Sequence, residues 1–250
     1  FQTMLGMSLV FIVCSVAGLV DNRTLLDISV WVKPAKFSLS IAIYFATLLW
    51  FVPLLPQGYF ATTRGRALSW TAAVCAIFEM AYILFQAARA EPSHFNISSP
   101  LYATLYSLMG FGAVLLVTVC LVLAVEIYRV HRLRSPFAFA AALGLFGTFL
   151  LGGGFGGYLG SSATGHWVDA PATDANGLIA FNWSREGGDL RVAHFFGMHV
   201  MQALPLLALM LPAHWSVAGA IRCLLLAFGL YALLTIGTFI QAVNGQPFLG

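Results

Sequence analysis

Seven long apolar segments, separated by short polar or glycine- and proline-bearing connections, set the pattern of this chain. Each segment approaches or exceeds the ~20 residues that a helix needs to cross the hydrocarbon core of a bilayer. We therefore predict an all-α integral membrane protein, a bundle of seven transmembrane helices that forms a single domain over residues 1–250. The predicted spans cover residues 3–20, 37–56, 67–88, 101–127, 137–160, 193–212 and 217–241, and the longest connection is the polar outer loop 161–192.

Composition agrees with this pattern and excludes some partners. The chain is 60% hydrophobic and only 8% charged, whereas soluble domains carry roughly 25% charged residues. A net charge of +3 without a basic patch beyond short loop clusters predicts no nucleic-acid partner. Membrane lipids are the expected partners, with other membrane subunits as a further possibility. The four cysteines lie in apolar runs without CxxC spacing, which favours small buried residues over disulfides or a zinc ribbon.

The basic residues predict the direction of insertion. Each side of the predicted bundle holds six Lys and Arg residues, but only one side groups them in short loops without acidic neighbours. That set is Arg64, Arg66, Arg129, Arg132, Arg134 and Arg222. Positive residues in short loops favour the cytoplasmic side. We therefore predict a multi-pass protein of the bacterial inner membrane with its N-terminus in the cytoplasm and its C-terminus outside.

One acidic residue, Glu79, falls within the third predicted span. It lies about 13 Å below the outer end of that helix at 1.5 Å per residue. Tyr82 and Gln86 follow at i+3 and i+7, so the three side chains share one helix face. A carboxylate at this depth is costly and requires a proton or a partner inside the bundle. We expect Glu79 to act in the site, with Tyr82 and Gln86 helping to bind a ligand.

The sixth span carries His199 about 10 Å and Gln202 about 15 Å below the same surface. The depth of Glu79 falls between these two values, which predicts that the three side chains meet across a helix interface. Pro205 follows directly and predicts a kink beside the site. Glu79 and His199 are therefore the candidate catalytic residues, and Gln202 is a candidate ligand-binding residue.

Four of the six histidines are expected on the outer side. His194 and His199 are five residues apart, so they do not share a helix face as the pair in an HExxH motif does. His194 is expected at the interface, near His94 and His166 of the outer loops. Imidazole and carboxylate together suit zinc, copper or iron. The candidate metal ligands are Glu79, His94, His166, His194 and His199.

Several functions share these residues. The preferred interpretation is an outward-facing pocket that binds a metal ion or a redox cofactor, either a metal, a quinone or, less favoured, haem. One alternative is a transporter or an accessory subunit whose polar network is structural. A second alternative is a zinc-dependent membrane hydrolase. Whether the protein is an enzyme stays open at this point.

Two further features bear on the site. Lys33 and Lys36 flank Pro34 just before the second predicted span, and they form either a clamp for an acidic ligand or headgroup, or a pair that snorkels to the interface. The fifth span contains overlapping glycine pairs that favour close helix packing, with a backbone surface for a flat cofactor or lipid chain as the alternative. In the outer loop, Asp189 is expected to cap the sixth helix or to pair with Arg191.

Overall fold

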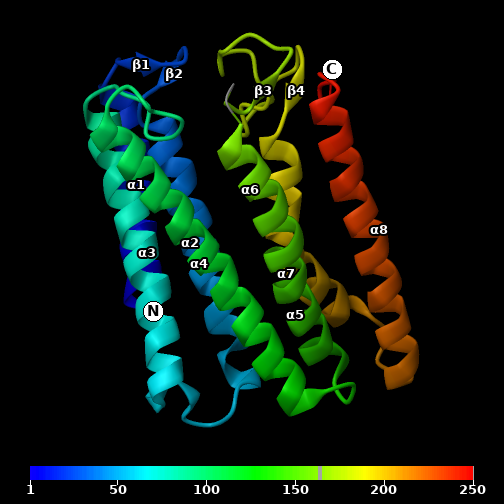
Figure 1. Cartoon of the computed structure of the whole chain (residues 1–250). Helices are drawn as coiled ribbons and strands as arrows, with labels where there is room; N and C mark the ends of the chain where they lie inside the picture. Colours follow the sequence, from blue (N-terminus) through cyan, green and yellow to red (C-terminus); the bar gives the residue numbers. More distant parts are fainter. Residues whose placement is uncertain (163–164, 250) are drawn as a thin grey trace.

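The computed structural model describes residues 1–162 and 165–249 and is a bundle of long, roughly parallel helices (Figure 1). Among these residues, seven helical segments are long and apolar enough to cross a membrane, as the sequence predicted. The helices are α1 (Gln2–Val20), α2 (Val32–Phe51), α3 (Thr63–Ala88), α4 (Pro100–His131), α5 (Pro136–Gly147), α6 (Gly153–Ser161), α7 (Arg191–Met210) and α8 (Val217–Val243). Short 3₁₀ turns cover Val52–Leu54 and Tyr59–Ala61.

Local signals explain where several helices begin. The side chains of Ser99 and Ser135 accept hydrogen bonds from backbone N–H groups in the first turns of α4 and α5. A proline follows each serine, at a position where a missing N–H costs nothing. Thr62 and Ser216 cap α3 and α8 in the same way. The second helix begins at Val32 and not near residue 37, so Lys33 and Lys36 belong to its first two turns.

The fifth predicted span is not one uniform helix. A π-helical turn, Thr148–Gly152, joins α5 to α6 within it. Glycines allow this turn to approach α7 closely. A Cβ added at Gly197 would stand 2.6 Å from the backbone nitrogen of Gly152, and one at Gly144 would stand 2.9 Å from the Cα of Met201. The close packing expected from the glycine pairs is therefore found, with Gly152 and Gly156 facing α7.

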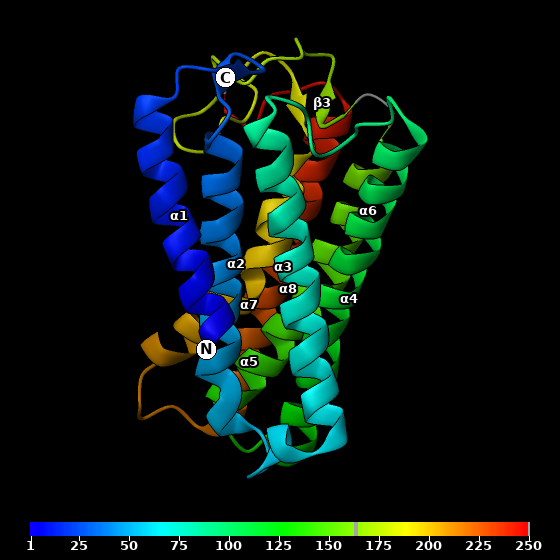
Figure 2. The same cartoon turned by 90° about the vertical axis from the view of Figure 1, so that its left-hand side faces the viewer.

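Most of the polar connections lie at one end of the bundle, which we name the capped end (Figures 1 and 2). It consists of residues 21–31, 89–99 and 165–190, together with the C-terminus. Strand β1 (Thr24–Leu25) pairs antiparallel with β2 (Ile28–Ser29), and β3 (Trp167–Val168) pairs antiparallel with β4 (Gly188–Asp189). The opposite end holds the connections 52–62, 132–135 and 211–216.

Helices α3 and α7, which carry residues at similar predicted depths in the membrane, pack mainly against different helices. Helix α3 packs mainly against α2 and α4, whereas α7 packs mainly against α5, α8 and the π turn. A large buried cluster joins α2, α3, α4 and α5 and includes Met7 of α1 and Met201 of α7, and a smaller one joins α5, α7 and α8. Polar side chains of α3 and of α7 therefore face different neighbours.

Candidate functional site

Two lysines interact electrostatically with four other charged side chains at the capped end, and we name these six the capped-end cluster. Lys33 is influenced by Glu79, Asp174 and Arg191, and Lys36 by Asp174, Asp189 and Arg191. The cluster therefore consists of Lys33, Lys36, Glu79, Asp174, Asp189 and Arg191. It draws on α2, α3, α7 and the long loop, segments far apart in the sequence.

Arg191, the first residue of α7, is fully paired. Its guanidinium bonds to Asp174 at 2.8 Å and to Asp189 at 2.7 Å, and it also donates to the carbonyl of Asn182 at 2.5 Å. The backbone N–H of Arg191 donates to Asp189 as well, at 3.0 Å. The predicted pairing of Asp189 with Arg191 is confirmed. Asp189 is 1% exposed, so this ion pair is buried and tightly defined.

The two lysines of α2 have different surroundings. Lys36 donates to the carbonyl of Phe181 at 2.8 Å and to the side chain of Asn182, both neutral acceptors. Lys33 makes no hydrogen bond or ion pair within the described residues, and its ammonium lies 5.8 Å from the centre of the Phe37 ring. Glu79 likewise lacks a hydrogen bond or a salt bridge there. Lys33 and Glu79 are thus opposite charges that influence each other without touching.

Gln86 and Tyr82 hold the adjoining loop. Gln86 is fully buried, and its Nε2 donates to the Tyr82 hydroxyl at 3.1 Å and to the carbonyl of Pro92 at 3.2 Å. The predicted shared face of Tyr82 and Gln86 is therefore seen as a direct contact. The Oε1 of Gln86 has no partner among the described residues. These two residues position the segment that carries His94.

His94 is a partly buried histidine in the loop after α3. Its Nδ1 lies 3.1 Å from the Ser93 hydroxyl, and its ring packs against Phe37 and Tyr106 with centroid distances of 5.3 and 5.9 Å. Burial, and then the positive charge of Lys33, holds the pKa of His94 well below 6.5. His166 and His194 are also close enough to influence it. No hydrogen bond joins these three histidines among the described residues, so their expected grouping stays a prediction.

His166 meets the ion-pair network from the long loop. Its ring packs against that of Trp167, with a centroid distance of 3.7 Å, and its Nε2 lies 3.5 Å from the carboxylate of Asp174. That distance is at the limit of a hydrogen bond, so the contact is chiefly electrostatic. Burial lowers the pKa of His166 more than Asp174 raises it. Burial raises the pKa of Asp174, but His166 and Arg191 together bring it below its usual value.

The two histidines of α7 point to different neighbours. The Nδ1 of His194 lies 3.0 Å from the carbonyl of Gly152, and a Cβ at Gly156 would stand 2.7 Å from the same ring. The ring of His199 packs against the ring of Phe195, with a centroid distance of 4.1 Å. His194 therefore lies against the π turn and α6 and does not point freely into the capped end.

The predicted meeting of Glu79, His199 and Gln202 is found only in part: the side chains of His199 and Gln202 are hydrogen-bonded, but Glu79 contacts neither of them among the described residues. The Nε2 of Gln202 donates to the Thr47 hydroxyl of α2 at 2.9 Å. No hydrogen bond or ion pair joins Glu79 to His199 within residues 1–162 and 165–249. The reason is the packing order, because α3 and α7 each pack against other helices. Thr47 carries no sequence signal, since a hydroxyl in an apolar helix commonly bonds to its own backbone.

The expected metal centre is not found either. In the described part of the chain, no three His, Cys, Asp or Glu side chains are grouped so that they could hold one metal ion. The proposed ligands are instead divided among separate contacts: His94 with Ser93, His166 with Asp174, and His194 with Gly152. Both the metal-bound interpretation and the zinc-hydrolase alternative therefore lack a preformed site.

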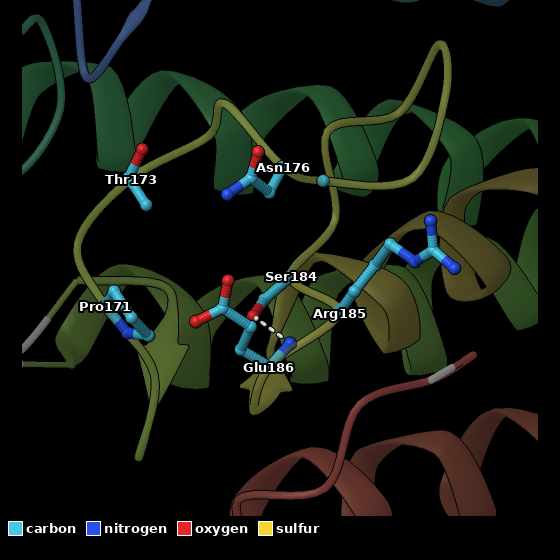
Figure 3. Close-up of a pocket in the computed structure, with 7 residues that line it drawn as sticks. Pro171, Thr173, Asn176, Ser184, Arg185 and Glu186 are labelled. Atoms are coloured by element: carbon cyan, nitrogen blue, oxygen red, sulfur yellow. Dashed lines mark hydrogen bonds between the residues drawn. The ribbon is translucent and has the colours of Figure 1, made fainter.

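A small surface hollow lies in the long loop (Figure 3). Its lining residues are Pro171, Thr173, Asn176, Gly177, Ser184, Arg185 and Glu186. The hollow, about 10 Å³, has room for about one water molecule. The hydroxyl of Ser184 accepts from the backbone N–H of Glu186 at 3.3 Å, and the side chain of Arg185 points away (Figure 3). This hollow is too small for a substrate.

Comparisons of the chain with protein-family models, with curated proteins and with solved structures found no match. The class that the fold defines is therefore a multi-pass membrane protein with seven candidate transmembrane helices. A charged cluster at one end is its most specific chemical feature.

Proposed function

We propose that this protein binds a small acidic ligand at the capped-end cluster and takes up protons with it. In this proposal the capped end faces the outside of a bacterial inner membrane, as the arginine-rich short loops at the opposite end favour. The observation that carries the proposal is Lys33, a cation in the first turn of a membrane-length helix that has no paired anion among the described residues. Unpaired ionisable residues in such helices are functional candidates.

The way in which the charges pair within the cluster supports an anionic ligand. Three cations, Lys33, Lys36 and Arg191, oppose three carboxylates, Glu79, Asp174 and Asp189. Arg191 pairs with both aspartates. Two lysines then remain for one glutamate, and neither contacts it. The cluster is neutral as a whole, so a bound carboxylate would act by giving Lys33 the direct anionic partner that it lacks among the described residues.

Protons would strengthen this binding. Protonation of Glu79 removes the one carboxylate that opposes the two lysines. An acidic ligand should therefore bind more tightly at pH 5.5 than at pH 7.5. Binding and proton uptake are then linked, since each favours the other.

The test uses the purified full chain in detergent. Thermal unfolding is followed with benzoate, with inorganic phosphate and with chloride at matched ionic strength, at pH 5.5 and 7.5. We expect benzoate to raise the unfolding temperature, more so at the lower pH. Lys33→Gln should abolish the shift, whereas Arg185→Gln, an exposed cation of the long loop, should retain it. A phosphate response without a benzoate response would reassign the ligand, and equal responses of all three anions or of both variants would refute the proposal.

A redox or metal role is the second candidate, and one contact favours it. The Nδ1 of His194 faces the carbonyl of Gly152. When this nitrogen carries the proton, Nε2 is left as the basic nitrogen, the arrangement usual in metal-binding histidines. The same nitrogen could accept a proton from a quinol. Metal analysis and an absorption spectrum of the purified protein test this candidate, and the absence of stoichiometric metal, quinone and haem would refute it.

A further inference from the structure

Among the described residues, the long loop of the capped end makes polar contacts with three other parts of the chain. At the β1–β2 hairpin, the N–H of Asp174 donates to the carbonyl of Leu26 at 3.1 Å, and the Thr173 hydroxyl donates to Asp27 at 2.7 Å. Its other polar contacts are with Lys36 of α2 and Arg191 of α7. The loop thus spans the approach to the capped-end cluster from one half of the bundle to the other.

Few apolar contacts hold this loop down. Trp183 is buried and packs against Phe181 and Phe195, with centroid distances of 4.4 and 5.3 Å. By contrast, Ile179 is 90% exposed. Ala180 and Asn182 have positive φ angles of 68° and 55°, a conformation that is unfavourable for alanine in particular. The closed form therefore depends on its polar contacts.

Two of these contacts use cations of the cluster itself. Asp174 and Asn182 of the loop bind Arg191, and Asn182 also binds Lys36. The Nδ2 of Asn182 in turn donates to the carbonyl of Asp174 at 3.3 Å, which joins the two contacts. If Asp174 and Asn182 let go of Arg191 and Lys36, both the loop and the two cations would be free.

We infer that residues 171–182 are a lid over the capped-end cluster, held closed by the contacts of Asp174 with Arg191 and of Asn182 with Lys36. Opening of the lid exposes Lys33 and Lys36 to solvent, while Trp183 stays packed on α7. The significance of the lid rests on the proposed ligand site, because the lid controls access to it. Its movement is measurable without any ligand.

Limited trypsin digestion of the full chain in detergent measures this opening. Arg185 lies three residues beyond the lid and is exposed, and Arg132 and Arg134 at the opposite end of the bundle provide reference cleavage sites in the same molecule. We expect Asp174→Asn to raise cleavage at Arg185, relative to the reference sites, by about tenfold or more, since a charged buried contact is lost. Asp169→Asn removes an exposed loop carboxylate and should leave the ratio unchanged.

Cysteine labelling supplies a second readout. Lys33→Cys places a thiol under the lid, and a water-soluble maleimide reports its accessibility. The wild-type protein gives the background from its four native cysteines, which lie within the apolar helices. Labelling should be faster when Asp174→Asn is added than when Asp169→Asn is added. Equal rates in both backgrounds would overturn the lid.

Lys36→Gln provides an independent variant if Asp174→Asn does not fold. It leaves the Arg191 ion pairs intact and should also raise cleavage at Arg185. Unchanged cleavage at Arg185 in every variant of Asp174 and Lys36 that folds would refute the inference. A responsive lid in a protein that gives no benzoate shift would instead refute the proposed function and leave the lid standing.

Discussion

The close backbone approach of α7 to the π turn predicts a large effect from a single added methyl group. A Cβ at position 197 would lie 2.6 Å from the nitrogen of Gly152, 2.7 Å from the carbonyl carbon of Leu151 and 2.8 Å from the Cα of Gly152. All three atoms belong to the backbone, so no side chain can rotate away. Gly197→Ala must therefore move α7 away from the π turn.

The cost follows from what this movement disturbs. Overpacking a close-packed interface costs about 1–3 kcal/mol. Separation of the two segments also weakens the bond between His194 and Gly152, at 3.0 Å, and that from Thr148 to Met198, at 3.3 Å. Each is worth about 1 kcal/mol. We expect a loss of about 2–4 kcal/mol, which corresponds to a fall in unfolding temperature of roughly 5–15 °C for a chain of this size.

Gly154→Ala is the matched control for this prediction. A Cβ at Gly154 meets no atom within 4 Å, although the residue lies only two positions beyond Gly152. Alanine there should leave stability unchanged or raise it by up to about 1 kcal/mol, because alanine favours helix more than glycine does. The assay is thermal unfolding of both purified variants in one detergent. If the two unfold within 2 °C of each other, the close approach of α7 to the π turn is wrong.

Three further predictions concern polar side chains. Thr47→Val leaves the amide of Gln202 without its acceptor and should cost about 1–3 kcal/mol in thermal unfolding, and an unchanged midpoint would refute the bond. The neutral forms of His94 and His166 are favoured in the folded protein, since their pKa values are lowered from 6.5. Stability should therefore be complete above pH 6.5 and fall as the pH drops below it, and replacement of either histidine by glutamine should flatten this dependence. Glu126→Gln removes a carboxylate paired with two exposed arginines at the opposite end, so its cost should stay below about 1 kcal/mol, and a larger loss on heating would contradict this.

The seven helices were predictable because length and apolarity are local properties. The ion pair of Glu126 with Arg129, at 3.5 Å, is equally local, since residues three apart on a helix are neighbours. The π turn within the fifth span was not predicted. Its glycines indicated close packing but carried no information about a change of helical repeat.

The site was harder to predict because depth in a helix does not give direction around it. Glu79 and Gln202 have similar predicted depths, yet Gln202 contacts Thr47 of α2. Which helices are neighbours depends on the packing of the whole bundle, which no single span reveals. Asp174 and Asn182 were missed for another reason. Both lie in an irregular loop, where polar residues are expected and no periodic pattern marks those that pair with Arg191.

The contacts of the capped end also bear on the order in which the protein can assemble during synthesis. Helices α1 and α2 pack against each other and are joined by a short hairpin, so they can associate as soon as both have left the ribosome. The contact of Lys36 with Asn182 joins residues 146 positions apart, and that of Asp27 with Thr173 joins residues equally distant. These bonds cannot form until most of the chain has been translated. Lys33 and Glu79 are therefore synthesised well before this loop exists, and the nascent helices must tolerate both charges without it.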